Sequence, residues 1–355
     1  MTHNERDKHL AMSLNRREVL TRIGAAAVAF SVASSTEVKA GKPPPKPILL
    51  ENGGFRYECI HDWLTPPPDI EWGDTHGIAI DSHERIYIAH TVGPNSRKGD
   101  AILVFDRHGR FLKSWGERFR GGAHGLDLRR ENGREYLYHC DINRKVFAKT
   151  DLDGNLIWEK GTPTEAGVYK DGAPFNPTNI ALADNGDFYV ADGYGSSYIH
   201  QYNIKGEYIR TFGGPGTEPG KLQQPHGIWV DKRGSEPLLV VADRANNRLQ
   251  YFTLDGKHVG FVTNGMRLPC HFHVQGELLL VPDLDHVVTI LDGKNQVAAQ
   301  LGDGRGMPEM RGHPRSDFPP GKFIHPHSAK FLSNGDILVV EWVPIGRVTL
   351  LRRLS

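Results

Sequence analysis

The chain has 355 residues, with 43 lysines and arginines against 42 aspartates and glutamates, and a formal net charge of +1. This balance excludes the strongly basic surface by which proteins bind nucleic acids or anionic membranes, so neither is an expected partner. Forty glycines and 23 prolines indicate many turns, and three cysteines (Cys59, Cys140 and Cys270) are too few for a disulfide framework, with at least one left unpaired within the chain.

Residues 1–40 are typical of a twin-arginine export signal. The pair Arg16 and Arg17 precedes a weakly apolar run at 23–33, which is far shorter than the roughly 20 residues that a membrane-spanning helix needs. The sequence EVKA then supplies a cleavage site after Ala40. The alternative is a basic amphipathic helix. We therefore expect a periplasmic or secreted protein, exported by the twin-arginine route, whose mature chain has no membrane span.

Residues 48–355, which follow a proline-rich spacer at 41–47, repeat a unit of about 50 residues. Each unit opens with a strand entrance such as THGIAI or PHGIWV. It continues with further strands that are separated by polar turns of the type Asp/Asn-x-x-Gly, as in LVFDRHGRFLKSW and HQYNIKGEYIRTF. At intervals of 45 to 56 residues, the entrances fall at His76, His124, Asn179, His226, His271 and His327.

This period is that of the four-stranded blades of a β-propeller, so six entrances predict an all-β, six-bladed propeller in one domain. Only three strand-like segments follow His327, whereas FRYECIHDWL at 55–64 is a spare strand at the start of the domain. We expect this N-terminal strand to complete the last blade, which closes the ring and leaves no open sheet edge.

The histidines at the entrances predict a metal site. The first strand of each blade lines the central channel, and His124, His226 and His327 occupy alternate blades, so they should lie about 120° apart around the axis. Three such imidazoles are the protein part of a tetrahedral zinc site with an open fourth position. In the alternative, the repeat keeps His-Gly for turn geometry or water-mediated hydrogen bonds. His76 and His271 belong to the other set of blades and are expected to line the channel.

Two stretches carry a family resemblance. DFYVADGYGSSYIHQYNIKGEYIRTFG (187–213) and PHGIWVDKRGSEPLLVVADRANNRLQYF (225–252) resemble the peptidyl-α-hydroxyglycine α-amidating lyases, which are zinc enzymes with six-bladed propellers of NHL-type repeats. The most specific motifs are Asp-Gly-Tyr at 192–194 and Ala-Asp-Arg at 242–244. The resemblance covers essentially the whole mature chain.

The resemblance implies a lyase that cleaves a carbinolamide, peptide-NH–CH(OH)–COO⁻, into a peptide amide and glyoxylate. It places the zinc ligands on the three histidines of alternate blades, the catalytic tyrosine on Tyr194 and a substrate-binding arginine on Arg244. A tyrosinate whose pKa is lowered by nearby cations can take the hydroxyl proton, and an arginine fork suits the substrate carboxylate. Asp243 could orient a metal-bound imidazole. The hydroxylated substrate would come from a separate monooxygenase.

Several positions depart from the family pattern. Thr91 replaces a substrate-binding arginine of the first blade, and Arg97 in the following loop is the nearest substitute. The family's channel calcium uses two backbone carbonyls, which fall on Ile78 and Leu126, and an aspartate whose position is Ser328 here. The loss of that carboxylate argues against a calcium ion.

Each assignment also has a simpler structural interpretation. Tyr194 can be a packing residue in a glycine-flanked turn, and Arg244 can pair with Asp243. His325, which stands where the family has a methionine, and Cys270 can be ordinary residues of the channel wall. For the whole protein, the alternatives are a non-catalytic NHL propeller that binds a protein or glycan, and a metal-dependent hydrolase or lactonase. Such hydrolases usually hold their metal with carboxylates and asparagine rather than with histidines.

Overall fold

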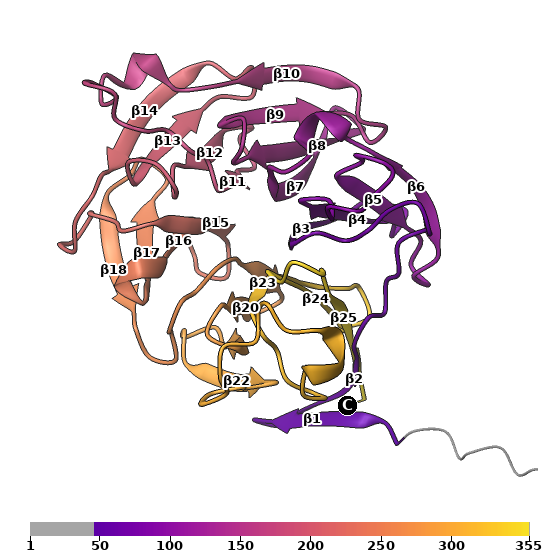
Figure 1. Ribbon diagram of the computed structural model, residues 1–355. Coiled ribbons are helices and arrows are strands. Elements are labelled where there is room, and N and C mark those ends of the chain that lie inside the picture. The colour runs from indigo at the N-terminus through magenta and orange to yellow at the C-terminus, as the bar shows by residue number, and fades with distance from the viewer. Residues whose placement is uncertain (1–45, 355) are drawn as a thin grey trace, which may run out of the picture. The chain divides into compact units, whose positions relative to one another are not determined.

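The protein is described here by a computed structural model that covers residues 46–354. The predicted signal at 1–40 and the spacer up to residue 45 lie outside the described residues. Within them, 25 β-strands form six antiparallel sheets, which Figure 1 shows arranged as the blades of a ring. The predicted six-bladed, all-β propeller is therefore confirmed.

Each blade is a meander of strands, and the first strand of each lies next to the channel. Blade 1 contains β3 (Thr75–Ile80), β4 (Ile86–His90), β5 (Ile102–Phe105) and β6 (Phe111–Trp115). Blade 2 contains β7 (Ala123–Glu131), β8 (Arg134–Asp141), β9 (Val146–Thr150) and β10 (Leu156–Lys160). Blade 3 contains β11 (Asn179–Leu182), β12 (Phe188–Ala191), β13 (Tyr198–Tyr202) and β14 (Tyr208–Gly213).

The second half of the ring continues this order. Blade 4 contains β15 (Pro225–Asp231), β16 (Leu238–Asp243), β17 (Arg248–Thr253) and β18 (His258–Val262). Blade 5 contains β19 (His273–Gln275), β20 (Leu278–Asp283), β21 (Val287–Leu291) and β22 (Val297–Leu301). Blade 6 contains β23 (Pro326–Phe331), β24 (Ile337–Glu341) and β25 (Val348–Arg353). Short 3₁₀ helices are η1 (Glu117–Phe119), η2 (Thr164–Ala166), η3 (Arg244–Asn246) and η4 (Arg315–Asp317).

The ring is closed by the N-terminal strands, as predicted. β2 (Phe55–Ile60) pairs antiparallel with β25, with Cys59 opposite Leu351. β1 (Ile48–Asn52) then pairs with β2, so blade 6 has five strands, one more than predicted. In Figure 1 the indigo β2 lies beside the yellow β25. Closure pairs the outer edge of β25 with another part of the same chain.

The turns between outer strands follow the predicted chemistry. In blade 1, Asp106 Oδ1 accepts hydrogen bonds from the backbone N–H groups of His108 and Arg110, each at 2.9 Å, and Gly109 adopts a positive φ of 81°. An aspartate side chain stabilises such a turn, and glycine takes the left-handed conformation without a steric penalty. Blade 5 differs, because Asn295 takes this conformation with a φ of 59°.

One polar residue at the end of the second strand anchors the entrance of five of the blades. In blade 4 the buried carboxylate of Asp243 accepts a hydrogen bond from the backbone N–H of Gln223 (2.7 Å), in the loop that leads to His226. The equivalent anchors of blades 1, 3, 5 and 6 are His90, Asp192, Asp283 and Glu341. In blade 2 the equivalent Asp141 accepts instead from Asn143, in the loop after β8. The five anchors fix the entrance loops relative to the rest of their blades.

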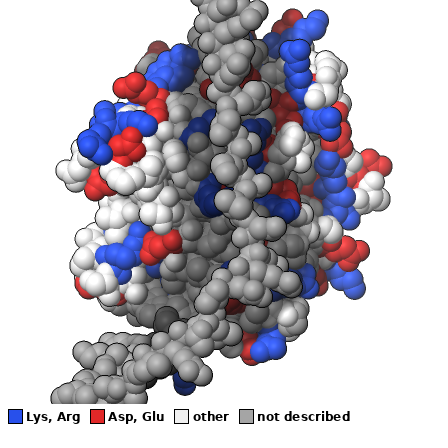
Figure 2. Space-filling view, turned by 90° about the vertical axis from the view of Figure 1, so that its right-hand side faces the viewer, with Lys and Arg blue, Asp and Glu red and all other residues white. Residues whose placement is uncertain are grey.

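Apolar side chains join neighbouring blades. Ile78 and Ile88 of blade 1, for example, pack in one buried cluster with Leu338 and Val340 of blade 6. Each blade is therefore stabilised chiefly by its two neighbours. On the surface that Figure 2 shows, basic and acidic side chains are interspersed. Among the described residues, no helix is long and apolar enough to cross a membrane.

Candidate metal centre and active site

The predicted histidine triad converges at one end of the channel. His124 on β7, His226 on β15 and His327 on β23 are buried, and they come from blades 2, 4 and 6. Their ring centroids form a nearly equilateral triangle, with separations of 4.8 Å between His124 and His226 and 4.7 Å for each of the other two pairs. Three imidazoles thus share one axial position.

Hydrogen bonds to neighbouring blades fix the orientation of all three rings. The Nδ1 atom of His124 lies 2.7 Å from the carbonyl oxygen of Thr178. That of His226 lies 2.8 Å from the carbonyl of Cys270, and that of His327 lies 3.0 Å from the carbonyl of His76. A carbonyl can only accept, so each Nδ1 carries the proton and each Nε2 keeps its lone pair.

These lone pairs fit a metal ion. The Nε2 atoms of His124 and His226 are only 3.2 Å apart, where two acceptors repel each other. Two nitrogens bound to zinc at about 2.0–2.1 Å in tetrahedral geometry lie about 3.3–3.4 Å apart. Burial lowers the pKa of His124 to about 3, and burial also lowers the pKa of His226 and His327. The rings are therefore held in the neutral state that a metal ligand requires.

Two further side chains border the triad. His76 lies with its ring centroid 4.6 Å from that of His124, and its Nδ1 is 3.2 Å from His327 Nε2. His76 forms one group of possible ligand atoms with His124 and His327, and the sulfur of Cys270 forms another with His226 and His327; within each group the ligand atoms all lie within 4.8 Å of one another. The described residues thus include more than one His/Cys group that could hold a metal ion. His271 instead contacts Ser328, with 3.4 Å between Nδ1 and the hydroxyl oxygen.

Tyr194 stands directly beside two histidines of the triad. It follows β12 in blade 3, and its hydroxyl oxygen is 3.0 Å from His226 Nε2 and 3.4 Å from His124 Nε2. A packing residue would not place its hydroxyl group between two imidazole lone pairs. Burial raises the pKa of Tyr194, and the guanidinium of Arg244 acts in the opposite direction. The net shift produced by the protein alone is thus opposite to the lowered pKa that we predicted.

Arg244 also reaches this site, from η3 in blade 4. The guanidinium is buried, with its Cζ atom 5.3 Å from the ring centroid of Tyr194. Its Nε donates to Gln224 Oε1 (3.1 Å), and its Nη1 lies 3.7 Å from the sulfur of Cys270. A fixed cation beside the tyrosine is suited to hold an anionic substrate. Cys270 is accordingly a neighbour of Arg244 rather than an ordinary wall residue.

Two predicted residues have other roles. Asp243 does not contact an imidazole: its carboxylate is the blade anchor described above, and its Oδ2 accepts hydrogen bonds from Asn246 (2.8 Å) and Arg248 (2.6 Å). It positions the loop that carries Arg244. Arg97, the predicted substitute for the arginine that Thr91 replaces, is exposed in the loop after β4.

Sequence reasoning missed a charged cluster near the entrance of blade 1. Arg311 Nη2 donates to both carboxylate oxygens of Asp74, at 2.9 and 2.8 Å, and the guanidinium Cζ lies 3.9 Å from the ring centroid of Trp342. His325 belongs to the same cluster, with Nε2 3.0 Å from Glu309 Oε1. No sequence signal marked Arg311, because it lies in the non-repetitive loop 302–325.

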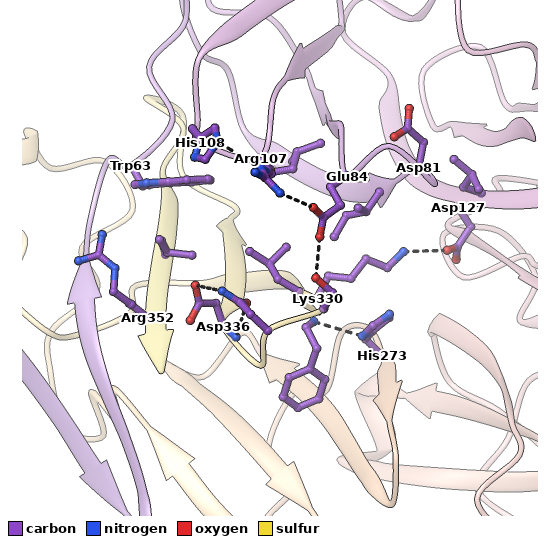
Figure 3. Close-up of a pocket in the computed structure, with 18 of the residues that line it drawn as sticks. Trp63, Asp81, Glu84, Arg107, His108, Asp127, His273, Lys330, Asp336 and Arg352 are labelled. Atoms are coloured by element: carbon purple, nitrogen blue, oxygen red, sulfur yellow. Dashed lines mark hydrogen bonds and ion pairs between the residues drawn. The ribbon is translucent and has the colours of Figure 1, made fainter. Parts of the chain in front are cut away.

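The residues do not fit the calcium ion of the resemblance. Lys330 Nζ donates to the carbonyl of Ile78 and to Asp127 Oδ1, both at 3.1 Å, and this ion pair is buried in the channel (Figure 3). Leu126 is buried on β7 beside it, and Ser328 supplies no carboxylate. An ammonium group at the Ile78 carbonyl would repel a divalent cation.

A cavity of about 780 Å³ lies beyond this ion pair, at the channel end opposite the histidines. Figure 3 shows its lining, which includes Trp63, Glu84, Asp127 and Lys330. The inner strands begin at the histidine end and finish at this cavity, so the cavity is separate from the triad. The described metal-ligand geometry, not cavity size, therefore marks the candidate active site.

Comparison with known proteins identifies relatives along most of the chain. This chain is 33% identical over 329 residues to peptidyl-alpha-hydroxyglycine alpha-amidating lyase 2 of Drosophila melanogaster, and the alignment covers 83% of this chain and 72% of the relative. It is 29% identical over 205 residues to NHL repeat-containing protein 3 of Homo sapiens. It is 27% identical over 210 residues to a probable lyase of the same name, pgal-1, of Caenorhabditis elegans. The chain spans 57% of the length of each of these last two relatives.

Solved structures support the fold. A streptogramin B lyase has a TM-score of 0.54 with 11% identity, over 84% of this chain and 98% of that one. A virginiamycin B lyase from Staphylococcus aureus, solved with quinupristin, has a TM-score of 0.53 with 12% identity, over 84% of this chain and 100% of that one. At this identity the likeness concerns the propeller fold alone. No family model matches the chain.

Proposed function

The chain belongs to the peptidyl-α-hydroxyglycine α-amidating lyase family, and on this premise we propose that it is a zinc-dependent lyase. Its substrate would be a peptidyl-α-hydroxyglycine or a similar carbinolamide, released as an amide and glyoxylate. The observation that carries the proposal is the convergence of three Nε2 lone pairs, each set by an Nδ1–carbonyl hydrogen bond, beside the hydroxyl group of Tyr194.

The reaction needs one proton removed and one delivered. The hydroxyl proton of the carbinolamide leaves, its C–O bond becomes the carbonyl of glyoxylate, the C–N bond breaks, and the amide nitrogen gains a proton. As a tyrosinate, Tyr194 would accept the hydroxyl proton and return it to the nitrogen, and its oxygen lies at hydrogen-bond distance from Nε2 of His124 and His226. Arg244 is placed to hold the carboxylate and so to orient the scissile bond.

His124, His226 and His327 would hold the zinc ion. A bound zinc ion supplies Lewis-acid chemistry, which lowers the pKa of a hydroxyl group that it coordinates. The buried setting strengthens the interaction of the Arg244 guanidinium with an anionic substrate, because water does not screen it.

Metal analysis of purified mature protein tests the metal site. We expect about one zinc per chain, as for other three-histidine sites with an open fourth position. His226→Gln should lose the metal, whereas His76→Gln should retain it, because His76 Nδ1 is not oriented by a carbonyl. Less than about half a zinc in the wild type would favour a non-catalytic NHL propeller instead.

Product analysis tests the reaction. We expect glyoxylate release from an N-acyl-α-hydroxyglycine, and a kcat about 10²- to 10⁴-fold lower for Tyr194→Phe with unchanged zinc content. Tyr198→Phe on β13 is the matched control and should keep its activity. Lactone or ester hydrolysis without glyoxylate release would instead identify a hydrolase.

We also propose that the protein acts in the periplasm or outside the cell, after export by the twin-arginine route. The proposal is supported by the Arg16–Arg17 signal in the sequence. A separate hydroxylating monooxygenase would supply the substrate, since an α-hydroxyglycine arises by oxidation of a terminal glycine. Fusion of residues 1–40 to a reporter, with Arg16 and Arg17 replaced by lysines as the control, tests the export route.

A further inference from the structure

We propose that Arg311 is a second substrate-contacting arginine, which holds the carboxylate from the side of the mouth opposite Arg244. This inference rests on the proposed function, because it assigns the carboxylate of that substrate. It concerns a residue outside the repeats, in the loop 302–325 between β22 and β23.

The repeat places Trp342, the residue on which Arg311 stacks, near the site. The residue after the blade anchor is Arg244 in blade 4, following Asp243, and it reaches Tyr194. The equivalent residue in blade 6 is Trp342, following Glu341, so symmetry directs it toward the same mouth. The guanidinium of Arg311 stacks on Trp342, with Cζ 3.9 Å from the ring centroid. In blade 6 the loop thus places an arginine over Trp342, which is the equivalent of Arg244 in blade 4.

The link with blade 1 brings Arg311 toward the histidines. Arg311 Nη2 donates to both oxygens of Asp74, which lies two residues before His76. The ion pair therefore ties the loop to β3, the strand that begins at Thr75 and carries His76.

Arg311 retains an accessible hydrogen-bond donor. Its side chain is 30% exposed, and among the described residues its guanidinium donates through Nη2, to Asp74. Nη1 therefore remains available to an incoming acceptor. Stacking on Trp342 and pairing with Asp74 hold the guanidinium in place, so an anion would meet a pre-oriented donor.

The supporting loop is packed rather than free. Met310, next to Arg311, is buried in a small cluster with Phe318, Ile324 and Val343. The backbone N–H of Arg311 donates to Glu309 Oε1 (2.6 Å). The apolar cluster joins the loop to blade 6, which fixes the arginine relative to the channel.

The chemistry of the site needs such a group. Thr91 occupies the first-blade position where the resemblance implies a substrate-binding arginine, and Arg97 is exposed in the loop that follows. Arg244 already uses Nε for Gln224. A carboxylate has two oxygens and can accept from two guanidinium groups. Arg311 from the loop would therefore supply hydrogen bonds to the substrate carboxylate in addition to those of Arg244.

Isothermal titration of zinc-loaded protein with hippurate tests the proposal without turnover. Hippurate carries the acyl-glycine carboxylate, and its methyl ester is the probe that lacks the negative charge. Arg311→Gln should weaken hippurate binding about 10- to 100-fold, as for a lost hydrogen bond to a charged group. Arg311→Lys should give an intermediate loss, because lysine keeps the charge but not the planar fork. Binding of the ester should change less than about threefold.

Arg305→Gln is the matched control, because Arg305 is an exposed arginine of the same loop. It should bind hippurate as the wild type does. Equal loss of hippurate and ester binding in Arg311→Gln, or no loss of either, would overturn the assignment. Weaker hippurate binding in Arg311→Gln, in a protein that releases no glyoxylate from α-hydroxyglycine substrates, would support Arg311 as an anion-binding residue while the proposed lyase reaction fails.

Discussion

The buried Lys330–Asp127 ion pair offers the sharpest stability prediction. Both residues are about 95% buried, with exposed fractions of 6% and 4%, and Lys330 Nζ has two oxygen partners at 3.1 Å. Replacing Lys330 by methionine leaves a buried carboxylate without its cation, which costs about 3–5 kcal/mol. With an unfolding entropy of roughly 2.1 cal/mol/K per residue over residues 46–354, the melting temperature should fall by about 5–8 °C.

The pH dependence of this deficit has a defined sign. Burial raises the pKa of Asp127, and Lys330 opposes the shift. Without the lysine, the folded-state pKa of Asp127 rises further above its unfolded value, so the folded state of Lys330→Met binds the extra proton. Its stability therefore falls as the pH rises through this range, and the deficit should be larger at pH 8 than at pH 5. Thermal melts followed by circular dichroism at both pH values measure this difference.

Two controls make the reasoning refutable. The exposed pair Lys232–Asp184, with side-chain exposures of 52% and 78%, should lose less than about 1 kcal/mol in Lys232→Met. The double variant Lys330→Met/Asp127→Leu should recover most of the loss, because no unpaired charge remains. A wild-type melting temperature that rises with added calcium, or falls with a chelator selective for it, would contradict the fit of an ammonium group at this position.

Three further outcomes follow from buried groups. Burial lowers the pKa of His139, which packs on Phe119, to about 3. The stability that the neutral imidazole contributes is therefore fully present above about pH 6.5, and below that pH it is lost by about 1.4 kcal/mol per pH unit. In thermal melts between pH 7 and 4.5, the stability of His139→Gln should fall less steeply with decreasing pH than that of the wild type. Burial raises the pKa of Cys59 to about 12 and of Cys270 to about 11, so a thiol reagent should react only after denaturation, and reaction of the native protein would contradict this burial. Asp243→Asn should cost about 1–3 kcal/mol in guanidinium titrations without loss of zinc affinity; a 10- to 100-fold lower zinc affinity would instead restore the imidazole-orienting role.

The blade architecture could be predicted from the sequence because it depends on local chemistry that recurs. Each Asp/Asn-x-x-Gly turn marks one pair of outer strands, and the spacing of the entrances sets the blade number. The closing strand followed from a count of strands after His327. The additional β1 was missed, although its pairing with β2 depends on a hairpin at Gly53–Gly54, and a Gly-Gly pair between two strand-like runs is a hairpin signal.

The site was predictable only where the ring symmetry applies. His124, His226 and His327 converge because equivalent residues of alternate blades face one axis, and Tyr194 lies between two of those blades. The carbonyl groups that set the imidazole protonation come from backbone, which no side-chain pattern reveals. The predicted role of Asp243 was wrong because it was inferred from the neighbouring Arg244 alone. Asp192 and Asp283 occupy the same position in blades 3 and 5, and this repetition indicates a structural anchor. Arg311 lies outside the repeat and has no equivalent in the other blades.

A lysine on an inner strand did carry a signal that sequence reasoning did not use. Lys330 interrupts an apolar strand, and Asp127 does the same on β7. Opposite charges in two strands that both line a channel favour an ion pair across it. The pair places an ammonium group where the resemblance implied a divalent ion.

The seam between β2 and β25 joins residues that are synthesised far apart in time. Tyr57 pairs with Arg353, so the strand that closes the ring has no neighbour until the intervening blades have been made. Until then the growing chain is an open arc with two unpaired flanks, and the histidines of blades 2, 4 and 6 have no common centre. The histidine triad consequently assembles only after β25 has been synthesised, and not with the folding of any one blade.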